Sequence, residues 1–240
     1  MLPTLSDTRP LHLVGANLSA QAILLSSTQS PYLILCPNDK IAWDLTCNLK
    51  TLIDISSTSS EHKIFHFPGW DILPTQAIHF SSLVSKKRLE VFSYLAQKPI
   101  LISTLPATFQ ATLPPSLFQN TSFTLQKGML PLRPHVLEKL KHSGYTRVDL
   151  VEDRGTFAIR GEILDVFPSH EDDAFRIQWD DDHILRISRF DPSTQCTVEN
   201  QDSLFIPPAH EVLLPETPEL RAEMRKKIKK QLYIFQLRNR

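Results

Sequence analysis

The chain has 240 residues, a mass of 27.4 kDa and equal numbers of acidic and basic side chains, 26 of each. Hydrophobic residues make up 41% and charged residues 22%, which excludes a disordered, collagen-like or coiled-coil polypeptide. A net charge of zero does not indicate a strongly basic nucleic-acid binder. The six glycines also give little material for a glycine-rich cofactor loop.

The cysteine count and the apolar runs indicate the compartment. Cys36, Cys47 and Cys196 lack the spacing of zinc ligands, and an odd count does not support a disulfide framework. No apolar run is long enough to span a membrane, and the N-terminus lacks the pattern of a signal peptide. We therefore expect a cytoplasmic protein without a membrane span, a metal ion or a cofactor.

From the N-terminus to about residue 118, short apolar runs alternate with helical patterns. Strands are expected at 11–15, 32–36, 63–67 and 100–102. Helices are expected after a cap at Ser19, after Asn38 and Asp39, and over 84–95. Because strand and helix alternate with short connections, we expect a parallel α/β sheet in this part of the chain.

The pattern then changes to short strands separated by turn residues. A strand over 122–125 precedes a helix over 134–142 that ends at Gly144. Five strands are expected next, at 147–151, 156–159, 162–166, 175–179 and 184–187. No segment of helix length separates these strands, so we expect them to pair antiparallel.

Three regions follow from these patterns. Residues 1–120 form the expected α/β domain, residues 121–203 an α+β domain, and residues 204–240 a partial return to the first domain that ends in a basic helix from about Glu219. This last region is unusual in charge, because residues 217–240 carry eight basic and two acidic side chains. Two interpretations of this basic tail are open: a solvated helix face, or weak contact with DNA or another acidic partner.

The turn after the first expected strand occupies the position of a phosphate-binding loop. Such a loop has the pattern GxxxxGK(S/T), in which backbone amides and the lysine bind phosphate and the hydroxyl binds magnesium. Counting from Gly15, the second glycine falls at Ala20, the lysine at Gln21 and the hydroxyl at Ala22. The groups that bind phosphate are therefore missing, and we expect no nucleotide binding here.

Other catalytic patterns are missing as well. No GxSxG motif occurs, and no cysteine has a histidine at an informative spacing. The Asp180-Asp181-Asp182 run and His210-Glu211 contain metal-ligand residue types, but an aspartate run between two strands is typical of a solvated turn.

Two arginines, Arg160 and Arg176, lie in apolar, strand-forming runs that are surrounded by acidic residues. One interpretation is an internal salt bridge with a neighbouring carboxylate. The other is an anchor for a protein partner, because the planar head of arginine, with its several donors, is frequent at interface hot spots.

The order and spacing of several motifs resemble the UvrB/Mfd family over nearly all of residues 11–214. In the second half these motifs are Gly144-Tyr145, Val151-Glu152, Gly155, Phe157-Ala158, Arg160-Gly161, Ile163–Pro168, Phe175-Arg176-Ile177, Trp179, Phe190-Asp191 and Pro208–Glu211; in the first half they are Phe67-Pro68, Trp70-Asp71, Leu73-Pro74 and Lys87-Arg88-Leu89. UvrB has a working phosphate loop and an aromatic-rich hairpin for DNA. This chain has neither, so it is more similar to the Mfd branch, the transcription-repair coupling factors.

The resemblance implies a RecA-like parallel-sheet domain without a phosphate loop and an inserted α+β antiparallel UvrA-interaction domain. It also implies docking of UvrA through Arg160 and Arg176, in transcription-coupled nucleotide excision repair. The family has two consecutive aromatics where this chain has Trp179 and Asp180. The loss of the second aromatic implies a weaker or rearranged UvrA contact through Trp179.

The chain is far shorter than a full coupling factor, which continues into a module for RNA polymerase and an ATP-driven motor. We therefore expect a non-enzymatic binding module, from a truncated gene product or an excised fragment. RNA polymerase would be reached only through modules that this sequence lacks. Two alternatives stay open: a UvrB-like ATP-dependent repair helicase subunit, and a non-functional remnant of a decayed gene.

Overall fold

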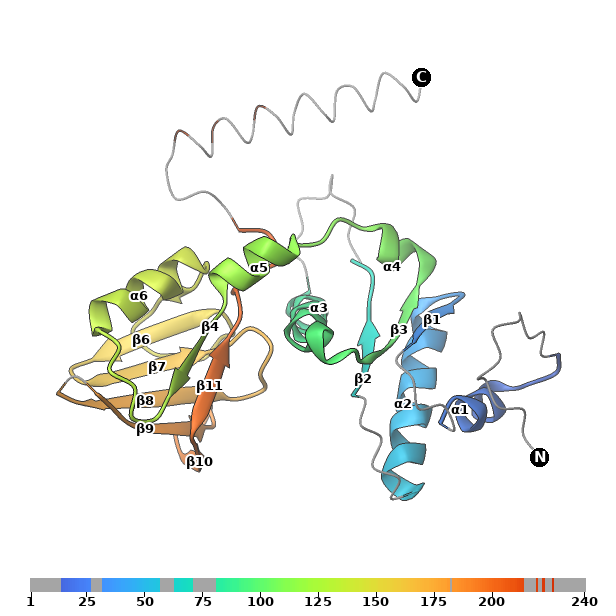
Figure 1. Cartoon of the computed structure of the whole chain (residues 1–240), viewed down its shortest axis with the longest axis horizontal. Coiled ribbons are helices and arrows are strands. Elements are labelled where there is room, and N and C mark those ends of the chain that lie inside the picture. The colour runs from blue at the N-terminus through green and yellow to red at the C-terminus, as the bar shows by residue number, and fades with distance from the viewer. Residues whose placement is uncertain are drawn as a thin grey trace. The chain divides into compact units, whose positions relative to one another are not determined.

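The computed structural model describes residues 14–26, 32–56, 63–70, 81–181 and 183–213, together with Glu219, Ala222 and Lys226. The chain divides into two compact units, with the main boundary between Thr112 and Leu113. The elements of both units are labelled in Figure 1. No helix in the described residues is long and apolar enough to cross a membrane.

The first unit contains a three-stranded parallel sheet in the order β1-β3-β2. Its strands are β1 (Leu33–Cys36), β2 (Ile64–Phe67) and β3 (Ile100–Thr104). Ile100 and Ile102 of the central strand are buried, as expected of a parallel sheet that is covered by helices. The expected parallel pairing is therefore confirmed for these strands.

Helices accompany this sheet in the alternating order that the sequence predicts. They are α1 (Leu18–Ser26), α2 (Asp39–Ser56), α3 (Ser82–Tyr94), the short η1 (Leu95–Gln97) and α4 (Leu105–Phe109). The Asn38 side chain caps α2 by accepting a hydrogen bond of 2.9 Å from the Ile41 amide. Leu45 and Leu49 of α2 then pack against the sheet.

The start of the first unit differs from the expectation. Val14 and Gly15 lie in neither a helix nor a strand, and residues 11–13 of the expected first strand are outside the described residues. Helix α1 is capped by Asn17 instead of Ser19, because the Asn17 Oδ1 atom accepts a hydrogen bond of 2.9 Å from the Ala20 amide. Ser19 already lies inside the helix.

The second unit contains a six-stranded sheet in the order β10-β9-β8-β7-β6-β5. Its strands are β5 (Thr146–Arg147), β6 (Thr156–Arg160), β7 (Ile163–Phe167), β8 (Ala174–Asp180), β9 (His183–Phe190) and β10 (Thr197–Gln201). All neighbours from β6 to β10 pair antiparallel, as expected, whereas β5 and β6 pair parallel. The hairpin at Arg160–Ile163 and the hairpin at Asp180–His183 set the register of the central strands.

A separate two-stranded antiparallel ribbon joins the two ends of this unit. It consists of β4 (Phe123–Gln126) and β11 (Ser203–Ile206), with Phe123 directly opposite Ile206. Two helices, α5 (Pro115–Thr121) and α6 (Arg133–His142), complete the unit. Figure 1 shows α6 lying over one face of the large sheet, and the buried residues of α6, the ribbon and that face form one core.

The expected strand at 147–151 is wrong beyond its first residue, because β5 ends at Arg147. The chain then turns over the sheet, and Val151 becomes buried against Ala158, Phe167 and Phe190. Burial of the Val151 side chain on the face of the sheet is incompatible with a continuation of β5 along the edge of the sheet. The basic tail lies largely outside the described residues, of which Glu219, Ala222 and Lys226 are helical and exposed.

Candidate docking surface

Strand alternation gives the six-stranded sheet one apolar face and one polar face. Phe157, Leu164 and Ile177 point to the apolar face and belong to the core with α6. Across the other face, the register aligns Ala158 with Asp165, Asp165 with Arg176, and Arg176 with Ser188. This second face therefore carries charged and polar side chains, beside a second apolar cluster of Val151, Ala158, Phe167, Ala174 and Phe190.

Three arginines from three strands lie on the polar face, which we call the arginine face. Arg160 is two residues from Ala158 on β6, and Arg176 lies on β8. Arg186 on β9 is directly opposite Gln178, which is two residues from Arg176. Arg160 and Arg176 were predicted as site residues, whereas Arg186 was missed, because its side depends on the register of β8 and β9.

Arg176 forms an internal ion pair with Asp165. Its Nε atom donates to Oδ1 at 2.7 Å and one terminal nitrogen donates to Oδ2 at 2.8 Å. Asp165 is almost fully buried, and its hydrogen bonds raise the pKa of the Arg176 guanidinium. The guanidinium also lies 4.7 Å from the centre of the Phe190 ring. For Arg176, the salt-bridge interpretation is therefore correct.

Arg160 is held differently. It is exposed, and one terminal nitrogen donates to the Asp149 carbonyl oxygen at 2.7 Å. No carboxylate pairs with this guanidinium within the described part of the chain. Because a guanidinium has five donors, Arg160 keeps free donors for a partner.

A tight turn after β9 borders Arg176. Asp191 accepts hydrogen bonds from the Ser193 hydroxyl at 2.7 Å and from the Ser193 amide at 2.8 Å, and these bonds lower the pKa of Asp191. The turn brings the Gln195 Oε1 atom to 3.4 Å from an Arg176 terminal nitrogen. The side chain of Arg176 is therefore positioned by two different segments.

Trp179 and Asp180 lie on opposite sides of β8. Trp179 is buried in the core with Leu164 and Ile184, on the face opposite to the arginines. A direct partner contact through Trp179 therefore does not fit its burial, and this part of the expected site needs correction. Asp180 is exposed on the side of Arg176, and its Oδ2 atom lies 3.8 Å from His183 Nε2.

The four positions of the degenerate phosphate loop lie in the first unit. Gly15 and Ala20 are exposed, Ala22 is buried, and the Gln21 side-chain amide donates to the Ala16 carbonyl oxygen at 2.9 Å. Gly15 has a φ of +79°, which an L side chain rarely adopts. The described residues contain no group of three or more metal-ligating side chains.

Residues 123–212, most of which lie in the second unit, match the family model of the UvrB interaction domain. Over most of its length, the chain is similar to two transcription-repair-coupling factors. The factor of Haemophilus influenzae is 28% identical over 83% of the chain, and that of Myxococcus xanthus is 27% identical over 84%. It is also similar to the UvrABC system protein B of Treponema denticola, at 25% identity over 89% of the chain. The chain spans 17% of each coupling factor and 34% of that UvrB protein.

Proposed function

We propose that this chain is a non-catalytic UvrA-binding module of a transcription-repair coupling factor, acting in transcription-coupled nucleotide excision repair. The observation that carries this proposal is the match of residues 123–212 to the UvrB interaction domain, since this range contains the whole arginine face. Similarity to coupling factors over most of the chain supports the same conclusion.

The proposal includes an assignment of the three regions. Residues 1–120 are a RecA-like domain whose phosphate loop is degenerate, and the inserted UvrA-interaction domain begins at residue 121. The expected end of this domain at residue 203 is too early, because β11 (Ser203–Ile206) pairs with β4 and Ala209 belongs to the core of the second unit. A return toward the first domain is therefore proposed only for residues after 213. The parallel order β1-β3-β2, with helices between the strands, supports the first assignment. Gln21 and Ala22 in place of lysine and a hydroxyl support the degeneracy.

In this proposal, the site residues have different roles. Arg160 provides free donors to acidic groups of UvrA, and Arg176 presents a guanidinium fixed by Asp165. Asp180 places a negative charge where the family has an aromatic and therefore weakens binding to an acidic partner. Trp179 acts indirectly, by anchoring β8 in the core.

Calorimetry of the purified chain with purified UvrA tests the proposal. Arg160→Ala and Arg176→Ala should each weaken binding by roughly 30-fold, the effect of losing about 2 kcal/mol from an interface arginine. Asp180→Phe should strengthen binding, because it removes a repulsive charge and restores an apolar anchor. Lys141→Ala is a matched control, since Lys141 is exposed on α6, the helix that covers the opposite face.

Equal affinity of the parent and all three variants of the arginine face would show that UvrA does not dock there. The second candidate is a UvrB-like ATP-dependent helicase subunit, which the similarity to UvrB proteins favours. Binding of ATP with magnesium separates the two candidates, because only the helicase subunit requires it.

A further inference from the structure

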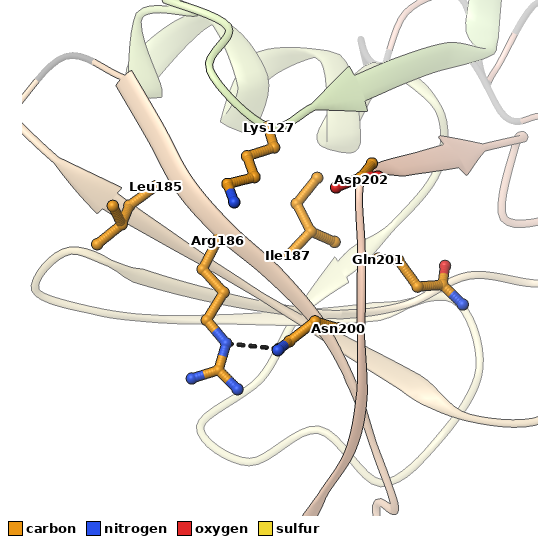
Figure 2. Close-up of a pocket in the computed structure, with 7 residues that line it drawn as sticks. All are labelled: Lys127, Leu185, Arg186, Ile187, Asn200, Gln201 and Asp202. Atoms are coloured by element: carbon orange, nitrogen blue, oxygen red, sulfur yellow. Dashed lines mark hydrogen bonds between the residues drawn. The ribbon is translucent and has the colours of Figure 1, made fainter.

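A pocket of about 380 Å³ lies beside the arginine face, between β9, β10 and the segment after β4. Figure 2 shows its lining, which consists of Lys127, Leu185, Arg186, Ile187, Asn200, Gln201 and Asp202. Backbone hydrogen bonds hold the walls: the Lys127 amide donates to the Asp202 carbonyl oxygen at 2.9 Å, and the Gly128 amide donates to that of Ile184 at 2.8 Å. The pocket is therefore built from hydrogen-bonded backbone.

Arg186 is fixed in orientation within this pocket. Its Nε atom donates to Asn200 Oδ1 at 2.6 Å, shown by the dashed line in Figure 2. Because Nε is occupied, the two terminal nitrogens remain available for an acceptor. Arg186 is exposed and forms no ion pair within the residues that the structure describes.

Lys127 adds a second cation from a different segment. In Figure 2 its ammonium group points toward β9, and Lys127 and Arg186 both line the pocket. Lys127 forms no ion pair with the described residues either. Asp202 contributes one carboxylate to the lining, so the pocket contains two positive charges and one negative charge. Of the two apolar residues in the lining, Leu185 is exposed and Ile187 is buried in the core.

We propose that this pocket receives an aspartate or glutamate side chain of the protein that docks on the arginine face. The inference rests on the proposed function and names a further contact of that surface. The two terminal nitrogens of Arg186 match the two oxygens of a carboxylate, and Lys127 adds a point charge. A single carboxylate leaves the pocket electrically balanced, whereas a doubly charged phosphate is disfavoured by Asp202.

The position of Arg186 connects the pocket with the arginine face. Arg186 is directly opposite Gln178, two residues from Arg176, so a partner that covers Arg176 can also reach the pocket. In this chain Asp180 removes an apolar anchor from the same strand. The pocket supplies a charged contact that offsets this loss. Recognition of the docking protein therefore depends more on charged contacts than on an apolar anchor.

The test is calorimetry with purified UvrA at low and high salt. Arg186→Gln should weaken binding by about tenfold and Lys127→Gln by a smaller factor, and both effects should shrink at high salt. Arg186→Lys should recover only part of the affinity, because an ammonium cannot make the two parallel hydrogen bonds of the guanidinium. Asn200→Ala should also weaken binding by releasing Arg186. Lys141→Gln makes the same charge change on α6 and should have no effect.

Each outcome decides the inference. If UvrA binds the parent, Arg186→Gln and Lys127→Gln equally, the pocket is not a docking contact, and the proposed function remains. If UvrA does not bind the parent, both proposals are wrong. If Arg186→Gln reduces binding of a single-stranded oligonucleotide in fluorescence polarisation but leaves UvrA binding unchanged, the pocket takes nucleic acid, and the inference is overturned. Circular dichroism of each variant establishes that it is folded.

Discussion

Arg176 and Arg160 differ in how much of their hydrogen-bonding capacity the protein itself uses. Two nitrogens of Arg176 are bound to Asp165, whereas Arg160 contacts a backbone carbonyl and otherwise faces solvent. Removal of Arg176 therefore leaves a buried carboxylate without its counter-charge, and removal of Arg160 does not. A binding experiment on Arg176 consequently needs a measurement of stability beside it.

We predict that Arg176→Ala lowers the free energy of unfolding of the second unit by about 3 kcal/mol, since an uncompensated charge stays buried. Arg160→Ala should change it by less than about 0.5 kcal/mol, because the residue is exposed. Urea denaturation followed by tryptophan fluorescence measures both values, with Trp179 as a reporter in the core.

A paired substitution isolates the cause. If the buried charge is responsible, the double variant Asp165→Leu with Arg176→Leu should be more stable than Arg176→Ala alone. Equal stability of Arg176→Ala and Arg160→Ala would mean that the pair with Asp165 contributes little.

At the scale of residues, the sequence predicts on which face of the sheet a residue lies better than it predicts whether the residue is buried. The turn over Pro168–Asp173, which the sequence predicts, joins β7 and β8, and Arg160 and Arg176 share a face of the sheet, while their role in binding stays a prediction. The burial of Trp179 could not be predicted, because it depends on packing against residues far away in the sequence. Arg186 was missed for a similar reason: its side is fixed by an irregularity in the pairing of β8 and β9.

Among the elements, the turn before α1 gives the clearest prediction that an activity is absent, namely nucleotide binding. Backbone amides at the start of a helix attract anions in general, but a nucleotide also needs a lysine and a magnesium ligand. Gln21 instead donates its side-chain amide to a neighbouring carbonyl oxygen. The position of the phosphate-binding lysine is therefore occupied by an uncharged side chain that is hydrogen-bonded within its own turn.

We predict that the chain does not bind ATP or GTP and does not hydrolyse them. Calorimetry at millimolar nucleotide with magnesium should give no saturable heat, and Gln21→Ala should behave like the parent. Saturable binding that Gln21→Ala abolishes would contradict this prediction and would favour the helicase alternative.

The elements with a strong local pattern are predicted best. Helix α2 begins at the expected cap, Asn38, and the strands β1 and β2 lie within one residue of the expected bounds. The expected strand at 147–151 is wrong because burial of Val151 on the sheet face outweighs its strand-forming sequence. Strand β10 was not expected, since its mostly polar, exposed residues carry little periodic signal. Strand β11 was not expected either, because it is short and directly precedes Pro207-Pro208, although its Leu204 and Ile206 are buried.

On the scale of the whole molecule, the charge of the chain is unevenly distributed along the sequence. We predict weak, salt-sensitive binding to DNA that comes from residues 221–240, because such binding scales with local lysine and arginine. Deletion of residues 221–240 should abolish it, whereas binding to UvrA should be unchanged. Fluorescence polarisation with a labelled duplex at two salt concentrations measures the effect, and equal DNA binding with and without these residues would contradict it.

The ribbon of β4 and β11 has a consequence for how the second unit can be rearranged. Phe123 and Ile206 are directly opposite each other, so their Cα atoms lie about 5 Å apart. Residues 123–206 therefore begin and end at nearly the same point. This segment can be inserted into another protein, or its two ends can be joined and new ends opened in the turn at Gly161, without a long linker.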